Sequence, residues 1–251
     1  MLEKIIRLIK NIFYGEDNLL SLTIIGVGPG DPSLLTIAAV RAIEKSQVIF
    51  YPISADYKNS IAGEIVKPYI KFKKRIPIVF PMARKEFDSN EVWRSAAEKI
   101  IYSVNKKKSV ALLCLGDTSI YASSTYIINE IKRTYPEIQI NIIPGISSLS
   151  LAAALSDFQL INSGEKLEVF ECPEDADELT NLINDKKKTV LAIMKVGKRW
   201  KWVKEVLIRN SLFSEVTLAV NLGFANQFIG AASDYIEKEL PYFSLILIRL
   251  K

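Results

Sequence analysis

Three loops of this sequence contain the residues whose types and spacing could do chemistry. They are residues 26–30, 116–118 and 144–148, and each comes directly after an apolar run. Helix starts and glycine turns expose backbone N–H groups that can bind a polar ligand, and the Asp117 carboxylate can pair with a cation or accept hydrogen bonds. Parallel sheets bind ligands at the carboxyl ends of their strands, so the three loops together predict a ligand cleft.

Two familiar nucleotide-binding motifs do not fit the first loop. The dinucleotide fingerprint places glycines at its first, third and sixth positions, but the sixth position here is Asp31. A carboxylate there would repel a pyrophosphate, and Phe50-Tyr51-Pro52 stands where the acidic ribose-binding residue is expected. The chain also lacks the GxxxxGKS or GxxxxGKT pattern of a phosphate-binding loop. We therefore expect neither kind of nucleotide site.

The residue composition excludes several classes of catalyst. The chain has 251 residues, no histidine and two cysteines, Cys114 and Cys172. It therefore has no Ser-His-Asp or Cys-His nucleophile, no HExxH site and no cysteine cluster for zinc. Chemistry must rest on carboxylates, lysine, arginine, tyrosine, hydroxyls and backbone amides, or on a cosubstrate that arrives activated, and we expect no metal site. The net charge of +5 is compatible with an anionic ligand.

The alternation of apolar runs and helical patterns predicts an α/β fold with a parallel-sheet N-terminal domain. A strand over residues 22–25, a helix that opens at Asp31-Pro32 and a strand over residues 47–51 form a βαβ unit. The apolar run at residues 109–115 predicts a strand that is buried on both faces. Further strands are expected at 76–81, 139–143, 167–170, 189–194, 215–220 and 244–248, and further helices at 60–70, 90–105, 122–133, 147–156, 174–185 and 199–210.

The turn chemistry at Pro144-Gly145 predicts a domain boundary. The expected parts are an amphipathic helical extension at 1–20, an N-terminal α/β domain at 21–143 and a C-terminal α/β domain at 144–251. No apolar stretch reaches the ~18–20 residues of a transmembrane helix, and charges interrupt the first residues, so that neither a membrane span nor a signal peptide is expected. Unpaired cysteines without an export signal favour the cytoplasm. No RNA motif or aromatic–basic stripe is present, so no nucleic-acid partner is expected.

The order of the loops resembles the tetrapyrrole methyltransferase family. The shared motifs are GVGPGDPSLLT from residue 26, GDTSIY from residue 116 and IPGISS from residue 143, and the likeness runs from about residue 22 to residue 250. The family moves a methyl group from S-adenosylmethionine (SAM) to corrinoid or porphyrinoid precursors. The resemblance implies two α/β domains with the SAM cleft between them, the C-terminal one with a mixed sheet, and a homodimer.

Within the family, four local features are similar to the branch of cobalamin biosynthesis that methylates precorrin-2 at C20. They are FYP from residue 50, VFPM from residue 79, IMKVG from residue 193 and PYFSL from residue 241. Uroporphyrinogen methyltransferases have a Tyr-Asp pair near residue 51, whereas this chain has Pro52. The chain departs from the family at Thr118, where a proline is usual. Metal-free precorrin-2 and cobalt-factor II remain open as substrates, and so does another tetrapyrrole methyltransferase. A more distant alternative is a noncatalytic SAM- or RNA-binding module.

The resemblance also implies roles for individual residues. The implied SAM contacts are Pro29, Leu115, Gly116, Asp117, Ile120, Ser147, Ser148, Met194 and Gly223. One ring proton must leave the substrate, and the candidates for a base by location are Tyr51, Tyr121 and Lys195. A tetrapyrrole with eight carboxylates gives the basic residues a use, so Arg84 is expected to bind it. Gly28 and Gly30 are expected to line the substrate trough, where bulky side chains would block a flat macrocycle.

Overall fold

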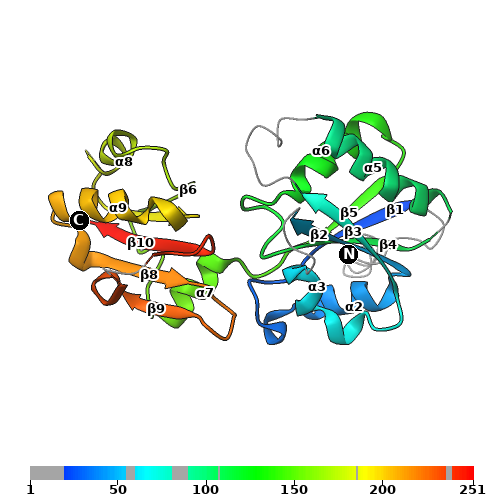
Figure 1. Ribbon diagram of the computed structural model, residues 1–251, viewed down its shortest axis with the longest axis horizontal. Coiled ribbons are helices and arrows are strands. Elements are labelled where there is room, and N and C mark those ends of the chain that lie inside the picture. The colour runs from blue at the N-terminus through cyan, green and yellow to red at the C-terminus, as the bar shows by residue number, and fades with distance from the viewer. Residues whose placement is uncertain (1–19, 55–59, 81–89, 107, 185, 236–238) are drawn as a thin grey trace, which may run out of the picture. The chain divides into compact units, whose positions relative to one another are not determined.

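The computed structural model describes residues 20–54, 60–80, 90–106, 108–184, 186–235 and 239–251. The helical extension predicted for residues 1–20 falls outside the described residues except for its last one, and the predicted substrate residue Arg84 falls outside them too. The chain divides into two compact units, of which the first ends at Ser147 and the second begins at Ser148. Each unit contains one five-stranded sheet (Figure 1).

The first unit is built on a parallel sheet. Its strands are β1 (Ser21–Gly26), β2 (Val48–Ser54), β3 (Lys74–Phe80), β4 (Val110–Cys114) and β5 (Gln139–Ile143), in the order β3-β2-β4-β1-β5. Helices α5 (Asn90–Asn105) and α6 (Ser124–Thr134) lie on one face of the sheet, and α2 (Ile37–Lys45) and α3 (Ile61–Ile65) lie on the other (Figure 1).

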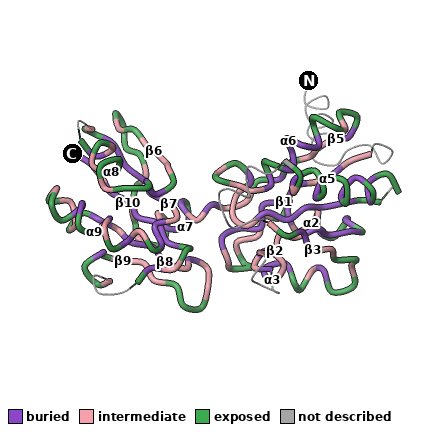
Figure 2. Tube along the Cα trace, turned by 45° about the horizontal axis from the view of Figure 1, so that its top comes forward, coloured by how far each residue is buried: buried purple, intermediate pink, exposed green. Residues whose placement is uncertain are grey.

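Successive residues of these strands point to opposite faces, which gives the first unit two cores. Leu112 belongs to the core under α5 and α6, whereas its neighbours Ala111 and Leu113 belong to the core under α2 and α3. All five residues of β4 are buried, as its continuous apolar run predicts. The buried strands form the centre of each unit in Figure 2.

The chain between β1 and α2 differs from the single helix predicted to open at Asp31. Asp31 instead caps the short 3₁₀ helix η1 (Pro32–Leu34), where its Oδ1 accepts from the Ser33 N–H at 2.7 Å. A separate helix, α2, begins later, and the Thr36 hydroxyl caps it by accepting from the Ala39 N–H at 3.0 Å. Two capping residues five positions apart both fit a helix start, and the sequence pattern does not decide between them.

The second unit contains a mixed sheet. Its strands are β6 (Lys166–Glu171), β7 (Thr189–Met194), β8 (Val216–Val220), β9 (Phe228–Ala231) and β10 (Ser244–Leu250), in the order β6-β7-β10-β8-β9. β6 and β7 are parallel, while β10 runs antiparallel to β7 and β8. The helices are α7 (Ser148–Leu155), α8 (Ala176–Ile183) and α9 (Trp200–Arg209). The prediction of a parallel sheet followed by a mixed sheet is confirmed.

One further predicted element was wrong, and one strand was not predicted. The helix expected over residues 60–70 is the five-residue α3 followed by the 3₁₀ helix η2 (Lys67–Tyr69), because Pro68 cannot continue the α-helical hydrogen bonding. Strand β9 was not expected, because its four residues Phe-Ile-Gly-Ala include a glycine and do not alternate in polarity. It forms only through its antiparallel pairing with β8.

Both cysteines are buried, so we expect their thiols to react slowly in the folded protein. Burial raises the pKa of Cys172 to about 12 and also raises the pKa of Cys114. The thiolate, which is the reactive form, is therefore scarce near neutral pH. Titration with Ellman's reagent should detect two thiols only after denaturation. Rapid reaction of one thiol per native chain would contradict this expectation.

Candidate functional site

The loops after β1 and β4 are joined by their backbones. The Gly28 N–H donates to Gly116 O at 3.2 Å, and the Gly116 N–H donates to Gly28 O at 2.8 Å, which forms an isolated antiparallel bridge. Both glycines have φ in the left-handed region, at +79° for Gly28 and +72° for Gly116. Side chains other than glycine rarely adopt this conformation. Gly28 therefore needs to be glycine for a backbone reason that is independent of any substrate.

A third loop, the one after β5, passes in close contact with the other two. A Cβ built on Gly145 would lie 2.2 Å from the carbonyl oxygen of Gly116, and a Cβ built on Gly26 would lie 2.4 Å from the Gly145 nitrogen. Real Cβ atoms do not approach backbone atoms so closely, so only glycine fits at both positions. The ends of β1, β4 and β5 thus form one glycine junction, which consists of Gly26, Gly28, Gly116 and Gly145.

The Asp117 carboxylate connects the second loop to the third. Its Oδ2 accepts from the Gly145 N–H at 3.1 Å, and its Oδ1 accepts from the Ser119 N–H at 2.8 Å and from the Ser119 hydroxyl. Partial burial raises the pKa of the Asp117 carboxyl, but the hydrogen bonds from Ser119, Gly145 and the Thr118 backbone lower it by more, so that the pKa lies below its usual value. The carboxylate is therefore ionised at neutral pH.

These hydrogen bonds leave Asp117 little capacity for a ligand. A carboxylate has about four lone-pair positions, and the donors to Asp117 are the Ser119 N–H and hydroxyl, the Gly145 N–H and the Thr118 backbone. The main role of Asp117 in the first unit is therefore to hold two loops together.

The glycine junction lies at a topological switch point of the first sheet. β1 and β4 are neighbours, but the chain leaves β1 toward α2 on one face and leaves β4 toward α6 on the other face (Figure 1). Open α/β sheets bind their ligands outside the carboxyl ends of the strands at such a point, because the diverging connections leave a crevice. The first unit therefore presents its candidate binding site at this edge.

Other residues that the sequence implicated surround the same edge. Pro29 is buried, while Gly30, Leu115 and Ile120 are half-buried, and Ser147 is buried at the end of the third loop. Tyr121 has a φ of +49° and an exposed side chain. Because Phe50 pairs with Leu112, Tyr51 is level with the residue that precedes the last residue of β4. The first unit thus brings all of its predicted site residues that the structure describes to one edge.

The second unit contains the remaining predicted residues. Met194 ends β7, and Gly223, with φ of +80°, lies in the loop after β8. β7 and β8 both run antiparallel to β10, so their carboxyl ends lie at the same edge, with Ser244 at the start of β10 between them. The Ser244 hydroxyl accepts from the Gly197 N–H at 2.8 Å. Ser148 is the first residue of α7.

The base candidate Lys195 lies next to Met194 in an ion pair. Its ammonium is 3.4 Å from the Glu171 carboxylate, and its φ is +57°. A backbone conformation of this kind costs about 1–3 kcal/mol in a residue other than glycine. The same holds for Tyr121. Asp157, Lys188, Ser211 and Asn221 also have a positive φ, so this conformation does not distinguish the two residues, and their role as a base stays a prediction.

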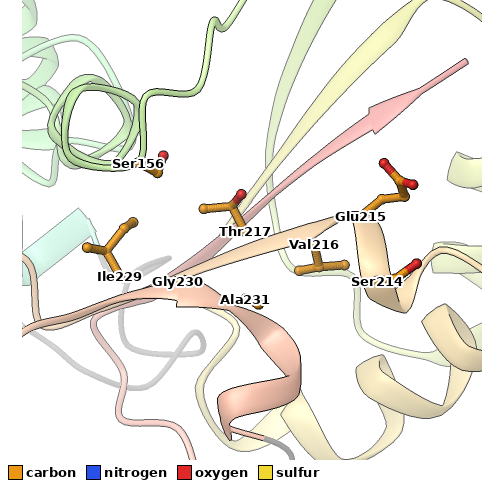
Figure 3. Close-up of a pocket in the computed structure, with 8 residues that line it drawn as sticks. All are labelled: Ser156, Ser214, Glu215, Val216, Thr217, Ile229, Gly230 and Ala231. Carbon is orange, nitrogen blue, oxygen red and sulfur yellow. The ribbon is translucent and has the colours of Figure 1, made fainter.

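A hollow of about 370 Å³ lies elsewhere on the second unit (Figure 3). It is lined by Ser156, Ser214, Glu215, Val216, Thr217, Ile229, Gly230 and Ala231. The Ser156 hydroxyl already donates to Ala152 O at 2.7 Å, and the Glu215 carboxylate is paired with Lys251 at 3.5 Å. None of the predicted site residues lines the hollow, and we do not assign it a ligand.

Sequence reasoning missed two parts of the site. Ser119 was not singled out, although an aspartate followed two positions later by serine is a recognisable turn pattern. Gly26 was quoted only as part of a turn, and its close approach to Gly145 could not be read from either local pattern. Among the residues that the structure describes, no group of three or more acidic or cysteine side chains could hold a metal ion. Within the same residues, no helix has the length and apolar character needed to cross a membrane.

Comparison with known proteins identifies relatives over most of the chain. It is 28% identical to the cobalamin biosynthesis protein CobIJ of Mycobacterium tuberculosis over 233 residues, which are 89% of this chain but 45% of that protein. The chain thus spans about half the length of this relative. It is 25% identical to the precorrin-2 C(20)-methyltransferase of a Sinorhizobium species, and the match covers 89% of this chain and 93% of the relative.

Three further comparisons agree with these. The cobalt-precorrin-2 C(20)-methyltransferase of Salmonella typhimurium is 26% identical, with 89% of this chain and 94% of the relative covered. The structure of uroporphyrin III C-methyl transferase from Thermus thermophilus has the same fold, with a TM-score of 0.62 at 18% identity over 90% of this chain and 96% of that one. A profile of the Tetrapyrrole (Corrin/Porphyrin) Methylases matches residues 21–233. The resemblance carried by the three loops is confirmed, and the chain belongs to the tetrapyrrole methylase family.

Proposed function

We propose that the chain is a SAM-dependent C-methyltransferase of cobalamin biosynthesis that methylates precorrin-2 at C20 to give precorrin-3A. The observation that carries the proposal is that two relatives named for methylation at C20 align with this chain over almost the whole length of both partners. The glycine junction supports it, because this edge of the first sheet is suited to bind a ligand. Cobalt-factor II is the alternative substrate, since one relative is named for the metal-free precursor and the other for the cobalt form.

The residues of the first unit fit SAM as a ligand. The space next to Gly116 is open, since a Cβ built there would meet no atom within 4 Å. The ionised, half-buried Asp117 carboxylate carries a negative charge, which suits a hydroxyl or ammonium donor. SAM has both groups. From the second unit, Ser148, Met194 and Gly223 remain proposed contacts on the strength of the family resemblance.

When bound, SAM supplies a methyl group on a positively charged sulfur, which is electrophilic without further activation. The chain's own contribution is then mainly to hold the two reactants in line, and such positioning can supply about 7–11 kcal/mol of the barrier. The glycine junction suits this task, because its backbone-to-backbone hydrogen bonds make the loops rigid. A chain without histidine can perform this reaction.

The new carbon–carbon bond replaces a carbon–hydrogen bond at C20, so the chain must also let one proton leave. Tyr51, Tyr121 and Lys195 remain the proposed groups that receive it. Tyr51→Phe, Tyr121→Phe and Lys195→Met, each measured for kcat and for SAM affinity, separate them. The variant that has lost the base should have a lower kcat with unchanged SAM affinity. If all three variants keep the kcat of the wild type, none of these groups is the base.

We also propose that Arg84, Gly28 and Gly30 contact the tetrapyrrole, that the protein is a homodimer and that it acts in the cytoplasm. The first rests on the carboxylates of the substrate and on the position of the glycines in the loop after β1. The second rests on the family resemblance, and light scattering of the purified protein tests it. The third rests on the biosynthetic role, and fractionation of cells tests it.

The proposed reaction is tested by incubation with methyl-labelled SAM and precorrin-2, with and without cobalt, followed by mass spectrometry and NMR location of the label. Label at C20 with one substrate form supports the proposal and identifies that form. Label at another carbon would make the chain a different tetrapyrrole methyltransferase. Binding of SAM without transfer to either form would favour a noncatalytic module.

A further inference from the structure

We propose that Ser119 is a positioning residue, which orients the Asp117 carboxylate so that it holds the Gly145 loop in its binding conformation. The part of this inference that concerns SAM rests on the proposed function. The part that concerns Asp117 and Gly145 stands on the hydrogen bonds alone.

The two oxygens of Asp117 have separate partners. Oδ2 reaches across 28 positions of sequence to the Gly145 N–H at 3.1 Å, whereas Oδ1 accepts both the N–H and the hydroxyl of Ser119. The two donors of Ser119 restrict rotation of the Asp117 carboxylate. Without the Ser119 hydroxyl, the carboxylate can rotate more freely about the bond to its Cβ, and Oδ2 is then less well aligned with Gly145.

No covalent restraint adds to these hydrogen bonds in the loop after β4. Residues 116–121 contain no proline, so no ring holds their φ angles. Ser119 is itself exposed, and its φ does not lie in the left-handed region. Removing its hydroxyl therefore creates neither a cavity nor backbone strain, and any effect comes from the lost hydrogen bond.

The chain contains a second turn of the same kind that serves as a control. Asp31 Oδ1 accepts from the Ser33 N–H at 2.7 Å, with the same spacing of two residues. Hydrogen bonds from the Ser33 backbone and side chain lower the pKa of Asp31 in the same way as those from Ser119 lower the pKa of Asp117. Asp31, however, caps η1 and is not bonded to the Gly145 loop.

The experiment compares Ser119→Val, which has no hydroxyl, with Ser119→Thr, which keeps one on a side chain of nearly the same shape. We measure hydrogen exchange at the Gly145 amide by NMR and the Kd for SAM by calorimetry. The loss of one hydrogen bond changes an equilibrium constant by about three- to tenfold. We therefore expect Gly145 exchange to be faster by about this factor, and SAM binding to be weaker by about this factor, in Ser119→Val. Ser119→Thr and the control Ser33→Val should leave both values unchanged.

The pH dependence of SAM binding gives a readout that loss of folding would not produce. SAM binding that depends on ionised Asp117 weakens as the pH falls through the lowered pKa of this carboxyl in the folded protein. In Ser119→Val the folded pKa rises, so the loss should begin at a higher pH than in the wild type. Thermal unfolding of each variant shows that it is folded.

The outcomes separate the two proposals. If the wild type binds no SAM, the proposed function fails, and Gly145 exchange still decides the role of Ser119. If the wild type binds SAM but Ser119→Val equals Ser119→Thr in Gly145 exchange and in Kd, Ser119 has no positioning role. Equal losses in Ser119→Val and Ser33→Val would also overturn the inference, because they would show a general effect of the substitution.

Discussion

Gly145→Ala is expected to lower the free energy of unfolding by about 3 kcal/mol or more and to abolish SAM binding. The added Cβ would lie 2.2 Å from the carbonyl oxygen of Gly116 and 2.8 Å from the carbonyl carbon of Gly26. Both neighbours are backbone atoms in rigid loops, so neither can move aside in the way a flexible side chain would. Overpacking in a well-packed interior costs about 1–3 kcal/mol and sometimes more, and this contact belongs to the costly end of the range.

Urea unfolding followed by circular dichroism measures the stability, and calorimetry measures SAM binding. The matched control is Gly164→Ala, which introduces backbone strain but no clash with a neighbouring atom. Gly164 has φ of +80°, and a Cβ there would meet nothing within 4 Å. Its expected cost is about 1–2 kcal/mol, the cost of placing an L-residue in the left-handed region. A cost for Gly145→Ala no larger than that for Gly164→Ala would mean that the junction is not rigid.

Asp117→Asn is expected to destabilise the folded protein by about 2–3 kcal/mol and to weaken SAM binding by roughly tenfold or more, in line with the loss of a hydrogen bond to a charged group. An asparagine has one acceptor oxygen and one donor NH₂ group, while both Asp117 oxygens accept from N–H groups. In the variant, either the Ser119 N–H or the Gly145 N–H must face an amide donor. The connection between the second and third loops is then weakened.

The same charge makes stability depend on pH. Because the folded pKa of Asp117 is lowered, its contribution is present above the unfolded pKa and is lost as the pH falls through the folded pKa. The difference in unfolding free energy between wild type and Asp117→Asn should therefore be largest near neutral pH and shrink in acid. Asp31→Asn controls for the substitution at neutral pH, where it should cost less than Asp117→Asn, since asparagine caps a helix about as well as aspartate does. A difference that stayed constant with pH would show that the charge of Asp117 is not the cause.

Much of the fold could be predicted from local patterns. The apolar run of β4 indicated a strand buried on both faces, and its five residues are buried. Where two local signals competed, the prediction was wrong. Asp31 and Thr36 are both good helix caps, and the choice between them depends on how residues 32–35 pack rather than on the sequence pattern. β9 could not be predicted, because only its pairing with β8 makes it a strand.

By itself, the sequence determined which chemistry is excluded and predicted in which loops the site lies. The absence of histidine is a matter of composition, and the three loops are visible because each glycine turn follows an apolar run. Only the tertiary structure decided what the residues in those loops do. It showed that Gly145 must be glycine because the Gly116 carbonyl passes beside it, and that Asp117 holds the Gly145 N–H. Both are contacts between strand ends that lie far apart in the chain, and no local pattern specifies which backbone atoms meet there.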